Sequence, residues 1–195
     1  MTKRGRFITI DGPNGVGKTT IVRLACERFR VLGWSVLQTK EPTSAFNRAN
    51  EEKRGPELAR LIVEDRRCHL ANEVEPSLRR GMYVICDRYI ESSLVYRKLD
   101  GISFEATYKE NSSFQIPNMS ILLIAPMLTL KERLKDKKTL TRFEREHTSE
   151  EELALYEETH RFLSERGFKS VVIKNDEVAP QIVAKRIVDL IMRLV

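Results

Sequence analysis

The feature that most constrains the fold of this chain is a short strand, a glycine-rich turn and a helix that follow one another directly near its start. Residues 7–10 (FITI) are apolar or β-branched and predict a buried strand, while a helical spacing of apolar residues begins near Lys18. The turn between them, Gly12–Thr19 (GPNGVGKT), fits the pattern G-x-x-x-x-G-K-[ST]. Glycines let backbone N–H groups converge on phosphate oxygens, and the helix N-terminus adds the positive end of its dipole. The sequence therefore predicts a phosphate cradle.

The same motif predicts the ligands of the cradle. Lys18 would neutralise charge on the β- and γ-phosphates of a nucleoside triphosphate, and the Thr19 hydroxyl would bind Mg²⁺. We therefore expect ATP and Mg²⁺ as cofactors. The residues expected to contact ATP are Gly12, Pro13, Asn14, Gly15, Val16, Gly17, Lys18, Thr19 and Thr20.

Four more short apolar runs, separated by helical patterns, predict the rest of the fold. They cover residues 35–37, 83–86, 121–124 and 170–173. The runs are almost continuously apolar, which is typical of parallel strands that helices cover on both faces. We therefore expect an α/β protein with the three-layer P-loop NTPase fold, in which a five-stranded parallel sheet is flanked by helices and carries a short lid.

Length and pattern predict a single domain over residues 1–195, because the sequence shows no internal repeat and no flexible linker. A long helix is expected from Pro56 to Arg80, with Leu58, Leu61 and Ile62 facing inward. The last helical segment carries an apolar stripe that would pack against the sheet.

Composition limits the partners of the chain. The net charge of +6 favours polyanions, and the absence of zinc-finger, RNP-like or basic heptad patterns favours nucleotides over nucleic acid. No apolar run approaches the roughly 18 residues that cross a bilayer, so we expect no membrane partner. The N-terminal residues 1–6 are basic but lead into a strand and not into an export signal. Three scattered cysteines (Cys26, Cys68 and Cys86) suit reduced, packed thiols in a cytoplasmic protein.

Polar residues near the carboxyl ends of the predicted strands are candidates for chemistry. Asp87 ends the strand at 83–86, where a doubly wound sheet places its ligands, and could face a metal ion. Arg88 could bind a phosphate with its guanidinium group, which we favour over the alternative of an ordinary surface ion pair. Residues 65–66 (Asp-Arg) are a weaker candidate, since a solvated helix face is the favoured interpretation of this pair alone. Residues 40–42 (Lys-Glu-Pro) could form only a turn, but their place at the carboxyl end of a strand points to the same crevice.

Residues 135–152 are rich in charge and poor in core residues, and we interpret them as a mobile lid. A solvated charge run is the alternative. Arg142 and Arg145 would share one helix face because they lie three residues apart. A lid arginine that closes over the γ-phosphate is a recurring way to stabilise a transferring phosphoryl group.

The ordered set of segments resembles the thymidylate kinase family over most of the chain. The resemblance is carried by the phosphate loop, the pair Glu41 and Pro42, the Asp-Arg pair that includes Arg66, residues 87–96 (DRYIESSLVY) and residues 141–144 (TRFE). It implies an ATP-dependent nucleoside monophosphate kinase of nucleotide biosynthesis, which transfers the γ-phosphoryl group of ATP to a deoxynucleoside monophosphate, usually dTMP to give dTDP. It also implies a homodimer.

The resemblance implies roles for individual residues as well. Arg88 would hold the acceptor phosphate, Arg66 and Ser93 would face the base, and Tyr96 would lie against the sugar. The full set expected at the acceptor is Asp11, Glu41, Pro42, Ile62, Arg66, Arg88, Ser92, Ser93 and Tyr96. The metal would be held by Thr19 and Asp87. Catalysis by alignment and charge neutralisation would rest on Lys18, Arg88 and Arg142.

Several positions differ from what is usual in that family, namely Asn14, Ile62, Asn118, Thr141 and residues 43–48. Asn14 is neutral where an acidic or arginine-containing loop is common, and Ile62 offers no π face where an aromatic residue often stacks on the base. Two alternatives therefore stay open. One is a related P-loop kinase for a different nucleotide, nucleoside or small metabolite, and the other is a P-loop ATPase or GTPase switch module. Against a GTPase, the chain has no Asn-Lys-x-Asp motif.

Overall fold

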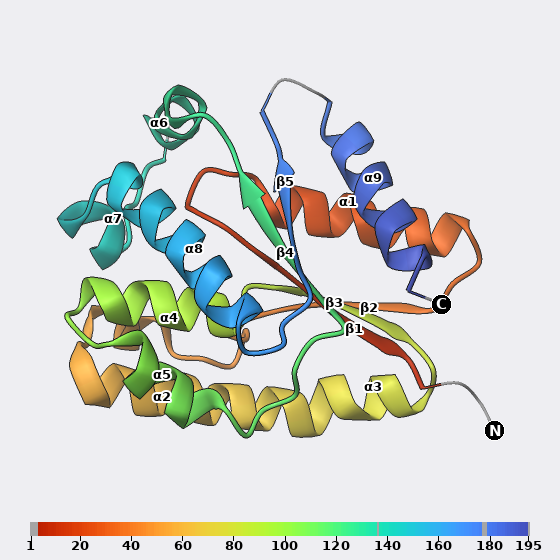
Figure 1. Ribbon diagram of the computed structural model, residues 1–195, viewed down its shortest axis with the longest axis horizontal. Coiled ribbons are helices and arrows are strands. Elements are labelled where there is room, and N and C mark those ends of the chain that lie inside the picture. The colour runs from red at the N-terminus through yellow and green to blue at the C-terminus, as the bar shows by residue number, and fades with distance from the viewer. Residues whose placement is uncertain (1–3, 136, 177–178, 195) are drawn as a thin grey trace.

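The computed structural model describes residues 4–135, 137–176 and 179–194, so residues 1–3 of the basic N-terminus and residue 136 of the expected lid lie outside the described residues. Figure 1 shows a twisted sheet at the centre of the molecule. Its strands are β1 (Arg6–Asp11), β2 (Val36–Lys40), β3 (Tyr83–Asp87), β4 (Met119–Ile124) and β5 (Ser170–Lys174). Their order is β2-β3-β1-β4-β5. All neighbours pair in parallel, as the sequence predicts.

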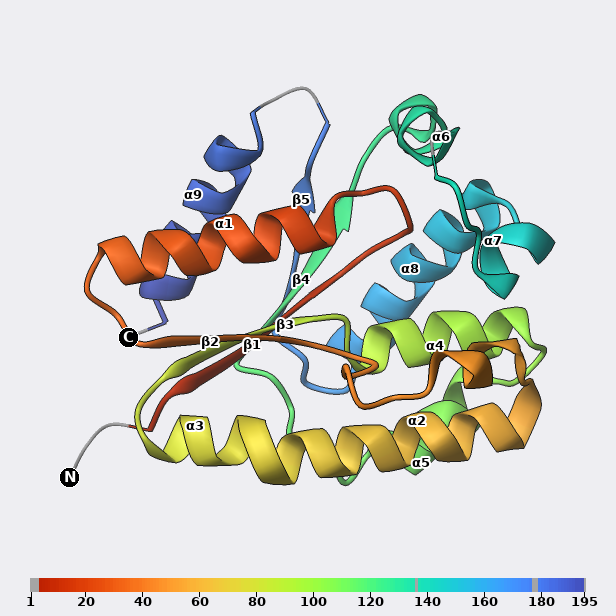
Figure 2. The ribbon, with the colours of Figure 1, turned by 180° about the vertical axis from the view of Figure 1, so that it is seen from behind.

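Helices cover both faces of this sheet. They are α1 (Lys18–Val31), a 3₁₀ helix η1 (Arg48–Glu52), α2 (Gly55–His69), a π-helical turn η2 (Leu70–Val74), α3 (Glu75–Arg79), α4 (Ile90–Leu99), α5 (Phe104–Asn111), α6 (Met127–Lys135), α7 (Arg142–Glu146), α8 (Ser149–Ser164) and α9 (Pro180–Met192). Figures 1 and 2 show α1 and α9 on one face, with α2, α3, α4 and α5 across the sheet from them.

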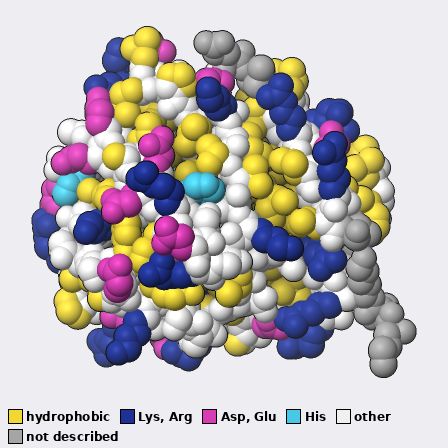
Figure 3. Space-filling view, in the orientation of Figure 1, with side chains coloured by type: hydrophobic (Ala, Val, Ile, Leu, Met, Phe, Trp, Pro, Cys, Tyr) yellow, Lys and Arg dark blue, Asp and Glu magenta, His cyan; other side chains and the backbone are white. Residues whose placement is uncertain are grey.

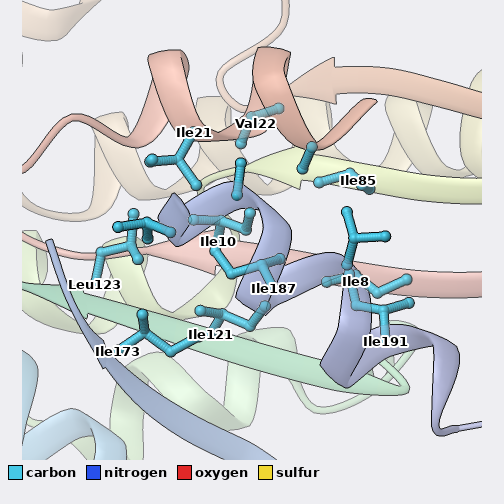
Figure 4. Close-up of a cluster of buried hydrophobic side chains, with 14 of the residues drawn as sticks. Ile8, Ile10, Ile21, Val22, Ile85, Ile121, Leu123, Ile173, Ile187 and Ile191 are labelled. Carbon is cyan, nitrogen blue, oxygen red and sulfur yellow. The ribbon is translucent and has the colours of Figure 1, made fainter. Parts of the chain in front are cut away.

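Alternation along the central strand builds the two cores. Ile8 and Ile10 of β1 pack with Ile85 and Ile121 of the neighbouring strands and with Ile187 of α9, all of them inaccessible to solvent. Figure 4 shows these side chains converging on α1 and α9. The large apolar area that they remove from water is the main source of stability for this face.

The opposite face of the sheet has its own core. Phe7 of β1 and Val84 of β3 point to this side and pack with Val74 of the π-helical turn, Leu78 of α3 and Leu94 of α4. Because successive side chains of a strand alternate between faces, a continuous apolar run supplies both cores at once. This explains why the predicted strands lack polar alternation.

The glycine-rich turn is held tightly between β1 and β4. Gly12 has a φ of 142°, and a Cβ at this position would lie 2.3 Å from the carbonyl oxygen of Leu123. Gly17 caps α1 with a φ of 93°. Only glycine adopts these conformations without strain. The glycines therefore allow the loop to pack closely against β4 at the carboxyl end of the sheet.

The expected helix from Pro56 to Arg80 forms as α2, the π-helical turn and α3 in direct succession. Its inward face differs from the prediction. Leu58, Leu61 and Ile62 are half-buried, whereas Arg66 and His69 are buried. An apolar stripe on a helix faces either a core or a cavity, and spacing alone does not separate the two. The thiol of Cys68 is exposed, so its assignment as a packed cysteine is wrong.

The expected lid, residues 135–152, contains the end of α6, all of α7 and the first turn of α8. Both α7 and α8 begin with a capping box, at Thr141 and Thr148. Figure 3 shows basic and acidic side chains interspersed over this part of the surface. Arg142 and Glu152 are nevertheless buried, so the segment is more than a solvated charge run.

Among the described residues, no helix is both long and apolar enough to cross a membrane.

We expect Ile187→Ala to lower the free energy of unfolding by about 2–5 kcal/mol, because it leaves a cavity between α9 and the sheet. Ile182→Ala on the same helix is the matched control, since Ile182 is 46% exposed. Its effect should stay within about 0.5 kcal/mol. Urea denaturation of both variants measures the difference, and equal losses would contradict the assigned packing of α9.

Glu91 is a carboxyl group within the second core. It is 5% exposed, Ser120 Oγ donates to its Oε1, and its Oε2 has no hydrogen-bond partner among the described residues. Burial, with a smaller contribution from the nearby Asp11 carboxyl, raises the pKa of Glu91 from 4.5 to about 8. The group is therefore protonated in the folded chain at neutral pH.

This proton makes stability depend on pH. Between pH 4.5 and 8 the folded chain keeps the proton that the unfolded chain has lost. Unfolding then releases a proton, so the free energy of unfolding falls with rising pH, by about 1.4 kcal/mol per unit for one proton. We expect Glu91→Gln to remove this slope and to gain stability relative to wild type from pH 5 to pH 8. Denaturation across this range tests it, with the exposed Glu157→Gln as control. Parallel curves for wild type and Glu91→Gln would mean that Glu91 is ionised in the fold.

Candidate active site

A cavity of about 550 Å³ opens at the carboxyl ends of β1, β2 and β3. The glycine-rich loop forms one wall, α2 and α4 form another, and residues of α6 and α7 complete it. Ligands of doubly wound sheets bind at this edge because the chain reverses its winding direction there. The cavity contains many of the residues that the sequence predicts at the site.

Lys18 is the first residue of α1, and its side chain lies against the phosphate loop. Its Nζ donates to the carbonyl oxygens of Gly12 and Pro13, at 2.7 and 2.9 Å, and its side chain is 6% exposed. Burial, and then the positive charge of Arg88, lower the pKa of Lys18 from 10.5 to about 7. An anion in the cavity would relieve both effects, so this lysine is suited to binding phosphate.

Thr19 and Asp87 meet across the floor of the cavity. Thr19 Oγ1 donates to Asp87 Oδ2 at 2.6 Å, while Asp87 Oδ1 is buried without a hydrogen-bond partner among the described residues. A hydroxyl and a carboxylate are oxygen ligands that Mg²⁺ prefers, and the unpartnered oxygen is available to such a cation. Elsewhere in the described part of the chain, no three His, Cys, Asp or Glu side chains are grouped to hold a metal ion.

Arg88 extends from the end of β3 with a φ of 73°. Neutral oxygens surround its guanidinium group. They are Asn14 Oδ1 (2.6 Å), Tyr96 OH (2.8 Å), Ser92 Oγ (3.1 Å) and Tyr156 OH (3.2 Å). The positive charge of Arg88 is thus fixed in position, and no carboxylate of the described residues is among its hydrogen-bond partners.

Asp11 lies behind this arginine and does not line the cavity, although the sequence analysis expected it at the acceptor. It is inaccessible to solvent and accepts hydrogen bonds from the backbone N–H of Tyr89 and from Ser92 Oγ. Burial raises the pKa of the Asp11 carboxyl, against the opposing effects of the Ser92 hydrogen bond and the charge of Arg88. Asp11 therefore acts on the cavity indirectly, by accepting the hydrogen bond of Ser92, which lines it.

Arg66 occupies the far end of the cavity and is 1% exposed. Its Nε donates to Glu41 at 2.7 Å, its Nη2 donates to Ser93 Oγ at 3.0 Å, and its Nη1 donates to Asn111. The guanidinium carbon also lies 4.8 Å from the centre of the Tyr89 ring. These contacts hold the arginine rigidly beside Ser93, with donors and acceptors available to a polar ligand.

An apolar surface lies beside this polar end, on the turns of α2 that precede Arg66. Leu58, Ala59, Ile62 and Val63 line the cavity there. A planar ring could therefore contact aliphatic carbon on one side while its edge meets polar groups.

Arg142 lines the cavity but is firmly paired. Its guanidinium group binds both carboxylate oxygens of Asp100, at 2.7 and 2.9 Å, and Glu146 at 3.2 Å. It also lies over the ring of Phe143. To reach a phosphate, Arg142 would have to leave Asp100. Arg145, expected on the same face, instead pairs with Glu52 at the surface.

The structure gathers most of the predicted site residues around one cavity. Those that line it are Asn14, Gly15, Gly17, Lys18, Thr19, Thr20, Glu41, Pro42, Ile62, Arg66, Asp87, Arg88, Ser92, Ser93, Tyr96 and Arg142. Those that do not are Asp11, Gly12, Pro13 and Val16. Gly12 and Pro13 contribute carbonyl oxygens to Lys18, and Val16 is buried in the core.

Sequence reasoning missed several residues of this site. Asn111 binds Arg66, Asp100 binds Arg142, and Glu152 binds the loop at the backbone N–H of Asn14. Arg133 of α6 donates to carbonyl oxygens of the loop. None of these residues belongs to a motif, and Glu152 is the last of three consecutive glutamates. No local signal in the sequence marks them.

Comparisons with known proteins agree with this geometry. The thymidylate kinase family model matches residues 10–179. A probable thymidylate kinase of Pyrococcus abyssi is 36% identical over 155 residues, covering 73% of this chain and 76% of the relative. A probable thymidylate kinase of Caldivirga maquilingensis is 35% identical over 148 residues, covering 71% and 72%. The thymidylate kinase of Bordetella pertussis is 33% identical over 181 residues, covering 87% and 85%. The chain therefore belongs to the thymidylate kinase family.

Proposed function

We propose that this protein transfers the γ-phosphoryl group of ATP to dTMP and so produces dTDP. The observation that carries the proposal is the pair of unneutralised cations in one cavity, Lys18 on the phosphate loop and Arg88 at the end of β3. The two charges are close enough for Arg88 to lower the pKa of Lys18. Such a pair suits two phosphate groups that must approach each other.

On the donor side, the loop and the N-terminus of α1 would bind the triphosphate of ATP, with Lys18 turning from its two carbonyl partners to the phosphates. Thr19 and Asp87 would hold Mg²⁺, for which the unpartnered Asp87 Oδ1 is available. The metal, when bound, neutralises charge that develops on the β- and γ-phosphates.

On the acceptor side, Arg88 would bind the phosphate of dTMP. Arg66 and Ser93 would hydrogen-bond the base, while Ile62 offers it an apolar contact. Tyr96, whose hydroxyl lies 2.8 Å from Arg88 Nη1, would lie against the sugar. The acceptor is already an anion, so alignment and charge neutralisation suffice and no general base is needed.

The remaining assignments belong to the same proposal. Residues 135–152 would act as a lid on a single domain, and Arg142 would exchange Asp100 for the transferring phosphoryl group when the lid closes. The enzyme would work as a cytoplasmic homodimer. This part of the proposal is supported by the family resemblance and by the cysteine content.

A panel of acceptors tests the function directly. We expect ATP consumption with Mg²⁺ to be fastest with dTMP, followed by dUMP, and to be slow with ribonucleotides and free nucleosides. The physical reason is that Arg88 requires a phosphate on the acceptor and Tyr96 lies beside it. Initial rates at equal acceptor concentrations, with product identified by chromatography, give the order. A best acceptor other than dTMP would overturn the proposed substrate, and hydrolysis without any acceptor would favour an ATPase.

Arg88→Ala should raise the KM for dTMP and lower kcat, with kcat/KM for dTMP falling by about 10²–10³. The KM for ATP should change much less, because the loop and Lys18 remain. Arg186→Ala, an exposed arginine on α9, is the control for loss of one positive charge. Steady-state kinetics with each substrate varied separates the two effects. If a folded Arg88→Ala variant kept the wild-type KM for dTMP, the acceptor clamp would lie elsewhere.

A further inference from the structure

Glu152 is buried although it lies in the first turn of a surface helix. It is 6% exposed, and its carboxylate points away from α8 toward the phosphate loop and α4, beside which α8 runs in Figure 1. Its Oε2 accepts from the backbone N–H of Asn14 at 3.0 Å, and its Oε1 accepts from Tyr96 OH at 2.8 Å. A carboxylate that merely complemented the helix dipole would stay in solvent, as its neighbours Glu150 and Glu151 do.

The hydroxyl of Tyr96 requires an acceptor at this place. Its oxygen already receives N–H donors from Arg88 Nη1 at 2.8 Å and from Asn14 Nδ2 at 3.3 Å. The hydrogen of the hydroxyl must therefore point elsewhere, and Glu152 accepts it. An ionised carboxylate only accepts, so it fixes the direction of this hydrogen and leaves the oxygen free for Arg88.

Glu152 acts on Arg88 without pairing with it. The hydrogen-bond partners of Arg88 among the described residues are neutral oxygens, and the carboxylate lies one side chain further away, behind Tyr96. A direct ion pair would neutralise the guanidinium group and compete with a phosphate. Placing the anion behind a tyrosine orients the arginine and keeps its donors available.

The second bond of Glu152 fixes the loop. The backbone N–H of Asn14 is bound by Glu152 and is therefore not one of the amides that face the triphosphate. The side chain of the same residue accepts from Arg88 Nη2 at 2.6 Å. One carboxylate thus ties the loop and the tyrosine that contact Arg88 to a single point on α8.

We propose that Glu152 is a positioning residue, which aligns Arg88 for the acceptor phosphate through Tyr96 and holds the loop through the N–H of Asn14. This inference rests on the proposed function, because it concerns the acceptor clamp of that reaction. Neither the motifs nor the family resemblance assign a role to Glu152.

The test is a double-mutant cycle with Glu152→Gln and Tyr96→Phe. Glutamine keeps the shape of the side chain but has one oxygen for two donors. With that oxygen on the backbone N–H of Asn14, its amide brings a third N–H to Tyr96 OH and leaves the hydroxyl hydrogen without its acceptor. We expect the KM for dTMP to rise about tenfold, the usual scale for one hydrogen bond to a charged group, with a smaller change in the KM for ATP. The double variant should be no worse than Tyr96→Phe alone, because the glutamine oxygen keeps the bond to the N–H of Asn14 and the remaining effect of Glu152 acts through that hydroxyl.

Glu157→Gln is the control, since it removes an exposed carboxylate from the same helix and should behave as wild type. A melting temperature near that of wild type shows that Glu152→Gln is folded. Equal losses for both substrates, additive effects in the cycle or an unchanged KM for dTMP would overturn the inference. If Glu152→Gln does not fold, Tyr96→Phe decides alone, and an unchanged KM for dTMP in that variant would reject the relay.

Failure of the proposed function is recognised separately. Wild-type protein that does not use dTMP in the acceptor panel overturns the function, and the inference with it. Wild-type turnover of dTMP together with an unaffected Glu152→Gln variant rejects the inference alone.

Discussion

The ammonium group of Lys18 lies against the phosphate loop and donates to two backbone carbonyl oxygens. Arg88 lines the same cavity, and four neutral oxygens accept from its guanidinium group. Two positive charges are therefore held close together without direct neutralisation. The low pKa of Lys18 is the measure of that burial and repulsion. An anion that entered the cavity would be attracted by both charges. Most other features of the site follow from this constraint.

Carboxylates compensate the charge of Arg88 through intervening hydroxyl groups. Asp11 contacts Ser92 and Glu152 contacts Tyr96, so that a hydroxyl lies between each of these two acids and the guanidinium group of Arg88. Each hydroxyl can accept from a cation on one side and donate to an acid on the other. The two carboxylates thereby lower the positive electrostatic potential of the site without occupying the side of Arg88 that faces the cavity.

The sequence predicted the sheet, the loop and Arg88 because each depends on local pattern: apolar runs, glycines at fixed spacing, and a carboxylate followed by an arginine at a strand end. Contacts between distant segments were not predictable. Glu152 meets Asn14 across 138 residues, and no periodicity records such a pairing. The inward face of α2 was misjudged for a related reason, since Ile62 lines a cavity and a cavity wall has the same apolar spacing as a core.

The backbone of Arg88 carries a cost that the rest of the chain must offset. A φ of 73° places a side chain with a Cβ in the left-handed region, which disfavours it by about 1–3 kcal/mol. The backbone N–H groups of Arg88 and Tyr89 hold it there through Ile10 and Asp11. Selection for stability alone would favour glycine at this position. An arginine at this position therefore indicates that its side chain is needed for function, because a glycine would avoid the backbone strain but would supply no guanidinium group.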